Sequence, residues 1–467
     1  MKFSLGWLTS RWKHLNKSWP LFMPALKILV VFGLFWFMAW HTLDPDFGWH
    51  LRSGDYIRQH GVPSRDIFTY TARDFPWINH EWGNDVIVSV LYGFGGYFIL
   101  TLLYSAIWTS ALIIGGGLRT RLSIFFIAAA AVLEYSGIRP VAWTALLLVL
   151  LIKIVQGKSE RLKWVLPLMF LAWANLHAGF ISGLAVLAYF AVKNRQKTLG
   201  YILAASLLAT FINPYGPRLY VEVFRTLHDS QLHSQINEWY PVHMSRAAWS
   251  FAVLWGAGFW QFGKRKISDI FSLGPFLLLA TLSANRNLPL FVVASVKDLD
   301  KYCSLAIKKV PKVIDLPRKA IVYSLAASAL IVAVAGVHRA YGNPSVGREK
   351  AYPTQAVAYL KQHPCSGNLF NDYDYGGYLI WQLPNQPVYI DGRMPSWRND
   401  NGQKYINIYF DALKNESVQD QQFKKYDVKC VLLKGKHDDE PMFYRLEHSK
   451  WKLVVQQNGY FLFLAPN

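Results

Sequence analysis

Long apolar runs separated by short basic loops dominate the first two thirds of the chain. The first run, 21–40, contains one lysine among apolar and aromatic residues and is long enough to span a bilayer as a helix. Further runs lie at about 86–117, 122–137, 141–156, 164–177, 178–192, 198–213, 247–262, 269–284, 287–297 and 320–338. Several are shorter than the roughly 20 residues that a full span requires. The pattern predicts an α-helical membrane protein with about eleven spans of unequal length.

Two parts of this pattern have an alternative interpretation. A basic segment followed by 21–40 is also typical of a signal peptide. The run is too long for that, and no small-residue cleavage site follows it, so we expect a retained first helix. The runs 164–177 and 178–192 join at Asn175 and His177 with almost no loop. They are either two short helices or one interrupted helix.

The charge of the chain predicts its orientation in the membrane. Of the 467 residues, 52% are hydrophobic and 17% are charged, and the formal net charge is +20. A basic protein usually suggests a nucleic-acid partner, which the apolar runs argue against. With the N-terminus in the cytoplasm, the inner loops hold 22 Lys and Arg against five acids, as expected for cytoplasmic loops. The first outer loop, 41–85, instead has four Arg and seven acids.

The pattern changes near residue 340, where Gly342-Asn343-Pro344 marks a linker. Helix-like segments at 353–363 and 404–414 alternate with strand-like segments at 367–370, 387–391, 427–433, 452–457 and 459–464. This alternation predicts a small α/β domain over 340–467, outside the cytoplasm, after a multi-span domain over 1–339. Cys365 and Cys430 would pair in an oxidising compartment. A buried free thiol at Cys430 is equally expected, because that residue lies in an apolar strand.

Ionisable residues gather at the predicted outer ends of the spans. The first outer loop begins with Asp44-Pro45-Asp46-Phe47-Gly48-Trp49-His50-Leu51-Arg52 and closes with Asn79-His80-Glu81-Trp82. One interpretation is local, with Asp44 as a helix N-cap, Pro45 at the first helical position and the helix continuing over 47–60. Capping does not explain why so many other ionisable residues share the loop. Further polar residues at outer ends are Arg139, Asn175, His177, Arg218 and Arg286.

Each of these residues alone could reach lipid headgroups, but together they predict a polar cavity beside the membrane. Such a cavity suits the transfer of a sugar from a lipid carrier. Arginines bind phosphate through charge-assisted hydrogen bonds, and a carboxylate acts as general base toward an acceptor hydroxyl. Alternatively, Asp44 and Asp46 would hold a divalent cation, Mg²⁺ or Mn²⁺, that neutralises the leaving phosphate.

The tail has polar segments of its own. Asp372-Tyr373-Asp374-Tyr375 precedes Gly376-Gly377, and Asp391-Gly392-Arg393 follows a predicted strand. Asp and Gly favour turns after strands, which is one explanation. The other is an outer face that guides a substrate into the membrane cavity.

A first helix followed by an outer loop with Asp-x-Asp at its start and His-Glu near its end resembles the GT-C superfamily. These are multi-span glycosyltransferases that use polyprenyl-phosphate-linked sugars. The strings LDPDFGWHLRSGDYI, NHEW, RPVAWTALLL, NLHAGF, INPYG, GGYLIW and YIDGRM also resemble a bacterial group known only as glycosyltransferase-like. The resemblance implies an enzyme of the bacterial inner membrane. It would transfer a sugar from a polyprenyl-phosphate donor to a glycan, lipid or protein acceptor at the outer face.

The resemblance also assigns roles to residues. A first-loop acid is the catalytic base, which by position is Asp44 or Asp46, and Glu81 is the assisting second acid. Basic residues contact the phosphate of the lipid carrier, a role that goes first to Arg139 and Arg286. The remaining expected substrate-binding residues are His50, Arg52, His80, His177 and Arg218.

Two other functions stay open at this stage. A polysaccharide polymerase or O-antigen ligase would depend on the histidines and arginines and not on the acids. A transporter or a non-catalytic assembly factor is the third interpretation. A transporter predicts repeated halves, and no internal repeat is visible in the sequence.

Overall fold

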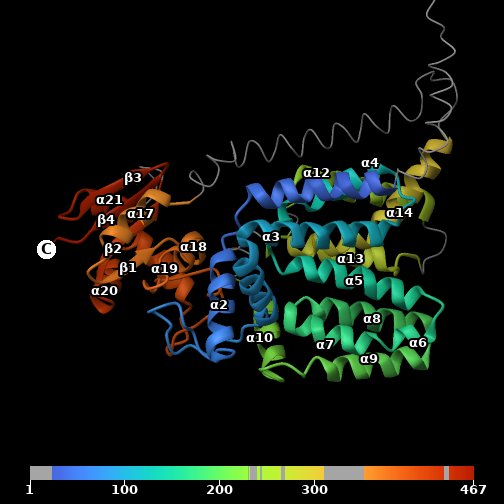
Figure 1. The fold of residues 1–467 in the computed structure, drawn as a ribbon, viewed down its shortest axis with the longest axis horizontal. Helices are drawn as coiled ribbons and strands as arrows, with labels where there is room; N and C mark the ends of the chain where they lie inside the picture. The colour runs from blue at the N-terminus through green and yellow to red at the C-terminus, as the bar shows by residue number, and fades with distance from the viewer. Residues whose placement is uncertain are drawn as a thin grey trace, which may run out of the picture.

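The computed structural model describes residues 24–229, 231, 239–241, 244–263, 269–309, 352–435 and 441–466. Figure 1 shows two parts, a bundle of roughly parallel helices and a C-terminal domain that contains a sheet. Helices α2 (Phe47–His60) and α10 (Arg218–Leu227) lie between the two parts and run across the direction of the bundle helices. The helix predicted over 47–60 is therefore confirmed as α2.

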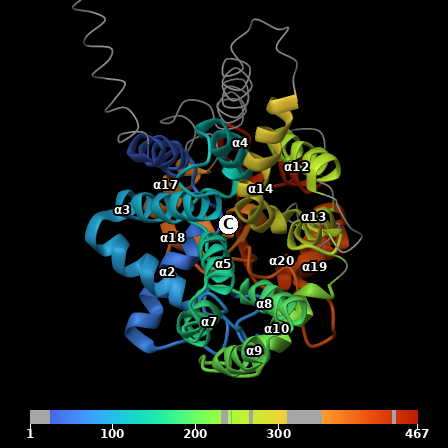
Figure 2. The same cartoon turned by 90° about the vertical axis from the view of Figure 1, so that its right-hand side faces the viewer.

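The bundle helices follow the predicted apolar runs. They are Pro24–His41, α3 (Trp82–Gly116), α4 (Leu122–Val132), α5 (Val141–Gln156), α6 (Glu160–Lys163), α7 (Leu166–Leu176), α8 (Phe180–Asn194), α9 (Lys197–Ala209), α12 (Arg246–Gly258), α13 (Leu273–Ser283) and α14 (Leu288–Lys309). Helix α5 contacts α3, α7, α8 and α14, and it lies near the middle of the bundle in Figure 2. The outer surface of the bundle exposes large apolar side chains such as Phe94, Leu168 and Val192. An apolar surface of this kind is expected where a bundle contacts lipid.

Helix length supports fewer spans than the sequence pattern predicts. Among the described residues, two helices, Pro24–His41 and Trp82–Gly116, are long and apolar enough to cross a membrane, and other apolar helices have 10–17 residues. The predicted count of eleven is therefore not confirmed. The run 287–297 is too short, because α14 continues to Lys309. The last predicted run, 320–338, and the linker at 342–344 lie outside the described residues.

Two interruptions within apolar stretches differ in kind. Helix α3 bends at Gly95 and Gly96, and Gly96 has a φ of +60°, which glycine adopts without steric cost. Its first part lies beside α2, whereas its second part runs along the bundle (Figure 1). The single run predicted over 86–117 thus comprises two segments. The chain also leaves helical geometry at His177, between α7 and α8, so the runs 164–177 and 178–192 are two helices.

The C-terminal domain is the predicted mixture of helices and strands. Its elements are α17 (Thr354–Gln362), β1 (Asn368–Asn371), η6 (Tyr373–Tyr375), α18 (Gly376–Gln382), α19 (Tyr405–Lys414), α20 (Glu416–Lys425), β2 (Val428–Lys434), α21 (Pro441–Glu447), β3 (Lys452–Gln457) and β4 (Tyr460–Leu464). The sheet has the order β1-β2-β4-β3, with β1 parallel to β2 and the other pairs antiparallel. Cys365 and Cys430 form a disulfide, which decides between the two states predicted for these thiols.

The strand predicted at 387–391 is wrong, and the reason lies in the first outer loop. Val388 forms isolated bridges to Leu369 and to Thr69 of that loop. The Val388 amide donates to the carbonyl of Phe68 at 3.0 Å, and the Tyr70 amide donates to the carbonyl of Val388 at 3.2 Å. The segment therefore joins the first loop to the C-terminal domain and does not extend the sheet as a regular strand.

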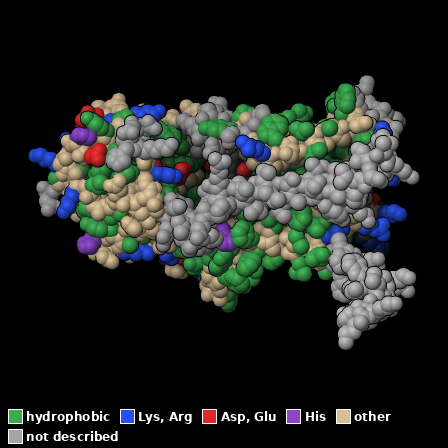
Figure 3. Space-filling model, turned by 90° about the horizontal axis from the view of Figure 1, so that it is seen from above, with side chains coloured by type: hydrophobic (Ala, Val, Ile, Leu, Met, Phe, Trp, Pro, Cys, Tyr) green, Lys and Arg blue, Asp and Glu red, His purple; other side chains and the backbone are tan. Residues whose placement is uncertain are grey.

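Basic residues gather at the end of the bundle that points away from the C-terminal domain. Helix α6, with Arg161 and Lys163, lies at that end in Figure 1. Figure 3 shows Lys and Arg side chains there, with hydrophobic side chains over much of the length of the bundle. The predicted inner loop at α6 and the C-terminal domain thus lie at opposite ends of the bundle.

Candidate functional site

The two acids that open the first loop have different surroundings. Asp44 is buried, forms an ion pair with Arg139, and accepts the backbone N–H of Asp46 at 2.9 Å. Asp46 is half-buried and accepts the indole N–H of Trp49 at 2.9 Å. The N-cap residue of α2 is Asp46, without a side-chain capping bond, so the helix begins two residues later than the local interpretation of Asp44 placed it. Its carboxylate is directed to an arginine 95 residues away in sequence.

Glu81 lies among three histidines that come from separate segments. Its Oε1 atom lies 3.6 Å from Nε2 of His177 and 3.7 Å from Nε2 of His80, and its Oε2 atom lies 3.9 Å from Nε2 of His50. Burial raises the pKa of Glu81 to about 8, against the opposing influence of His50. Glu81 therefore holds a proton near neutral pH, when it is able to donate a hydrogen bond.

Asp85 belongs to this cluster and was missed by the sequence analysis. Its Oδ1 atom lies 2.6 Å from Nδ1 of His50, and its Oδ2 atom accepts from Nδ2 of Asn79 at 2.7 Å. Burial alone would lower the pKa of His50, but the Asp85 carboxylate prevails and raises it to about 9. The available signal was an acid directly before the apolar run 86–117. From the sequence alone, Asp85 is one of the seven acids of the loop 41–85 and nothing else distinguishes it from the others.

Two arginines flank these acids. Arg139 precedes α5 and pairs with Asp44, while Arg286 precedes α14 and places its guanidinium 4.2 Å from the ring centre of Trp239. Burial lowers the pKa of His177 well below its usual range, and the charge of Arg286 acts in the same direction, so this imidazole stays neutral. Ion pairs, close contacts and charge interactions thus join the predicted residues Asp44, Asp46, His50, His80, Glu81, Arg139, His177 and Arg286 into one region.

Two predicted substrate-binding residues lie in other surroundings. Arg52 pairs with Asp55 at 3.2 Å and donates to the carbonyl of Trp381 at 3.0 Å, which attaches α2 to α18. Arg218 is exposed at the first residue of α10. The structure therefore gives Arg52 a role in packing and leaves Arg218 at the surface.

The arrangement does not fit a bound metal ion. Within the part of the chain that the structure describes, no group of three or more His, Cys, Asp or Glu side chains is arranged to hold one. The carboxylate of Asp44 is directed to Arg139, and that of Asp46 accepts from Trp49.

Arg393 of the C-terminal domain clamps the first loop. Its Nη2 atom lies 2.7 Å from Oδ1 of Asp66 and 2.7 Å from Oδ2 of Asp391, and all three side chains are almost fully buried. The guanidinium also packs on the rings of Phe68, Trp77 and Trp397, at 4.9, 4.4 and 5.2 Å from the ring centres. The segment Asp391-Gly392-Arg393 is thus more than a turn, because it holds the loop that carries the acids.

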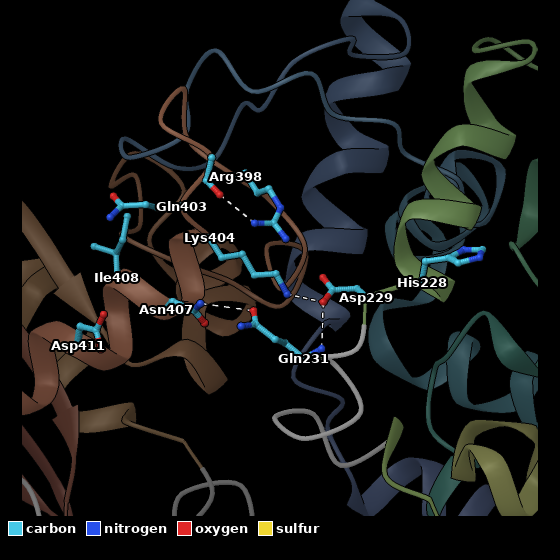
Figure 4. A pocket seen from close by; sticks show the side chains of 10 residues that line it. His228, Asp229, Gln231, Arg398, Gln403, Lys404, Asn407, Ile408 and Asp411 are labelled. Atoms are coloured by element: carbon cyan, nitrogen blue, oxygen red, sulfur yellow. Dashed lines mark hydrogen bonds and ion pairs between the residues drawn. The ribbon is translucent and has the colours of Figure 1, made fainter.

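A separate polar pocket of about 470 Å³ lies between the end of α10 and the C-terminal domain (Figure 4). Lys404 reaches across it and pairs with Asp229 at 2.5 Å. Burial opposes the charge of Asp229, but the bond from Lys404 prevails and lowers its pKa. The residues that line this pocket differ from the group around Glu81, and the ion pair connects α10 to the C-terminal domain.

Comparison with known proteins identifies the fold. No family model matches the sequence, and no curated protein matches it. Solved structures do match, among them the archaeal oligosaccharyltransferase AglB from Archaeoglobus fulgidus in complex with an inhibitory peptide and a dolichol-phosphate. That match has a TM-score of 0.57 and 13% identity, and covers 90% of this chain and 69% of the other. This chain shares the fold of that oligosaccharyltransferase.

Two further structures of the Archaeoglobus fulgidus oligosaccharyltransferase show the same likeness. The apo form has a TM-score of 0.59 at 13% identity and covers 90% of this chain and 70% of the other. The form tethered to an acceptor peptide that contains the sequon NVT has a TM-score of 0.53 at 13% identity, with coverages of 90% and 69%. The likeness is one of fold, and it agrees with the fold expected from the first-loop motifs.

Proposed function

We propose that this protein is an integral membrane glycosyltransferase. It transfers a sugar from a polyprenyl-phosphate-linked donor to a hydroxyl of a glycan, lipid or protein acceptor at the outer face of a bacterial inner membrane. The observation that carries the proposal is that Asp46 and Arg286 lie within electrostatic reach of Glu81, and that Arg139 pairs with Asp44 in the same turn as Asp46. The GT-C fold supports it, because one matching structure contains a dolichol-phosphate and another an acceptor peptide.

Asp46 is the first-loop acid best suited to act as general base. Asp44 pairs with Arg139, so its carboxylate is already engaged by a cation. Asp46 is partly open to solvent and lies within electrostatic reach of Glu81. In the transfer, Asp46 accepts the proton of the acceptor hydroxyl while the oxygen of that hydroxyl forms a bond to the anomeric carbon of the sugar.

The other residues serve the leaving group. The bond between the anomeric carbon and the phosphate oxygen breaks with its electrons on the phosphate, and Arg286 and Arg139 stabilise that charge. Glu81, protonated near neutral pH, donates a hydrogen bond to a phosphate oxygen. His80 and His177 hold the Glu81 side chain from one side, and His50, kept in place by Asp85, from the other.

The orientation in the membrane is part of the proposal. The N-terminus lies in the cytoplasm, about eleven helices cross or enter the bilayer over 1–339, and the domain over 340–467 lies outside. Support comes from the basic end of the bundle opposite the C-terminal domain (Figures 1 and 3). The disulfide agrees with an oxidising compartment for that domain.

The test is sugar transfer by the purified protein in lipid vesicles with a panel of labelled polyprenyl-phosphate sugars. Loss of a general base lowers the rate by about 10²- to 10⁴-fold, so Asp46→Asn should lose nearly all transfer. Asp44→Asn should also impair transfer, because it releases Arg139. The matched control is Asp74→Asn, an exposed acid of the same loop, which should leave the rate unchanged.

Full activity in both Asp44→Asn and Asp46→Asn would overturn the proposed mechanism. If His177→Gln then abolished transfer, a polymerase or ligase that depends on histidines and arginines would be favoured. Flux of a substrate across the vesicle membrane without any lipid-linked sugar would favour a transporter.

A further inference from the structure

The C-terminal domain approaches the turn before α2 at backbone distance. A Cβ atom on Gly377 would lie 2.2 Å from the carbonyl oxygen of Pro45, and a Cβ atom on Gly48 would lie 1.9 Å from the carbonyl oxygen of Gly377. Both distances are far below van der Waals contact, so only glycine allows this approach. The first turn of α18 is therefore seated directly on the Asp44-Pro45-Asp46 turn.

Gly392 makes a different contact, because it faces the Asp46 side chain itself. A Cβ atom on Gly392 would lie 2.2 Å from Oδ1 and 3.2 Å from Cγ of Asp46. The carboxylate thus occupies the space that any other residue at 392 would fill. On its other side, the indole of Trp49 donates to Oδ1 at 2.9 Å.

Gly392 is itself held in place by its neighbours. Arg393 forms buried ion pairs with Asp391 of its own segment and with Asp66 of the first loop. The segment cannot retreat from Asp46 without separating these charges. The position of the Asp46 carboxylate is therefore set jointly by α2 and by the C-terminal domain.

We propose that Gly392 is a positioning residue for sugar transfer, and that the C-terminal domain is a working part of the reaction site through it. The inference rests on the proposed function. The inference goes beyond that function because it assigns the placement of the general base to the C-terminal domain. A catalytic group displaced by about 1 Å costs on the order of 10²-fold in rate, so a single methyl group at 392 should be enough to reveal the role.

The first experiment compares Gly392→Ala with Gly435→Ala in the vesicle assay. The methyl group at 392 meets the end of the Asp46 side chain and no backbone atom, so the side chain moves aside and the fold is retained. At 435 the nearest atom, in the ring of Phe443, lies 4.0 Å from the new Cβ. We expect kcat to fall on the order of 10²-fold in Gly392→Ala, with the donor KM and the unfolding temperature unchanged. Gly435→Ala should match the wild type. A wild-type kcat in Gly392→Ala, or an equal loss in both variants, would overturn the inference.

The second experiment tests the contact without using activity. On a Cys303→Ser background, the pair Asp46→Cys and Gly392→Cys should form a disulfide on mild oxidation, detected as linked peptides by mass spectrometry. The pair Asp46→Cys and Gly435→Cys should not. Absence of the 46–392 link refutes the contact. If the 46–392 disulfide forms but the wild-type protein transfers no sugar, the contact is confirmed. The proposed function is then refuted, and the positioning role with it.

Discussion

Replacing Arg393 by Gln should release the first loop from the C-terminal domain. The guanidinium bonds Asp391 through Nε at 2.8 Å and through Nη2 at 2.7 Å, and the same Nη2 lies 2.7 Å from Asp66. The Asp66 and Asp391 side chains are 0% exposed, and that of Arg393 is 3% exposed. Gln would leave two buried carboxylates facing each other without a cation.

The cost of this substitution comes from the buried charges and from the rings around them. Breaking a buried ion pair by removing one partner costs about 3–5 kcal/mol. Each of the three aromatic rings around the guanidinium adds roughly 0.5–2 kcal/mol, with the larger values for a desolvated cation. From the ion-pair cost alone, the population of molecules in which the first loop is detached from the C-terminal domain should rise by about 10²- to 10³·⁵-fold.

Amide hydrogen exchange measures this detachment directly. The amides of Tyr70 and Val388 bond across the contact between loop and domain, so both should exchange faster in Arg393→Gln, while amides of β2 and β4 should not. The matched control is Arg398→Ala, which removes an exposed arginine five residues further along the chain. Unchanged protection of Tyr70 and Val388 in Arg393→Gln would refute the view that this residue clamps the loop.

Three further predictions concern protons, thiols and topology. Folded His50 keeps its proton up to a pH of about 9, whereas the unfolded chain releases it near 6.5, so its contribution to stability is complete below 6.5 and lost as the pH rises through 9. The unfolding temperature should therefore fall between pH 6.5 and 9, and it should fall less in Asp85→Asn. An unfolding temperature of the wild type that does not change over this pH range would contradict the pairing of His50 with Asp85. The denatured, unreduced protein should react with maleimide at Cys303 alone and at all three cysteines after reduction, and Cys430→Ser should cost about 2–5 kcal/mol of stability. On a Cys303→Ser background, Ser159→Cys should label only from the cytoplasmic side and Asn401→Cys only from outside, and labelling from the same side would exclude the proposed orientation.

Much of the fold was predictable, because it follows from local patterns. Long apolar runs located most of the bundle helices, and short strand-like segments located β1 to β4 to within a few residues. The errors occurred where a segment depends on a distant partner. The run 387–391 looks like a strand because its apolar residues are buried, but its partner is the first loop. The bend in α3 depends on two glycines that an apolar count treats as ordinary.

The sequence predicted which residues belong to the candidate site better than it predicted which of them contact one another. The outer ends of the spans identified the acids, histidines and arginines that the structure groups together. Residues adjacent in the sequence nevertheless differ in setting, since Asp44 faces Arg139 whereas Asp46 faces Trp49 and Gly392. Arg52, which the sequence places among the substrate-binding residues, attaches α2 to α18, a contact that no local pattern indicates.

The sequence by itself determined which segments are apolar helices, which end of the bundle is basic, and which loop carries the acids. These properties depend on the side chains within one segment and on their transfer from water, which composition and spacing report. Only the tertiary structure decided which acid is paired, which histidine is charged, and that Arg393 and Gly392 of the outer domain reach the first loop. Those outcomes depend on burial and on charges brought together from segments hundreds of residues apart, and no local pattern contains that information.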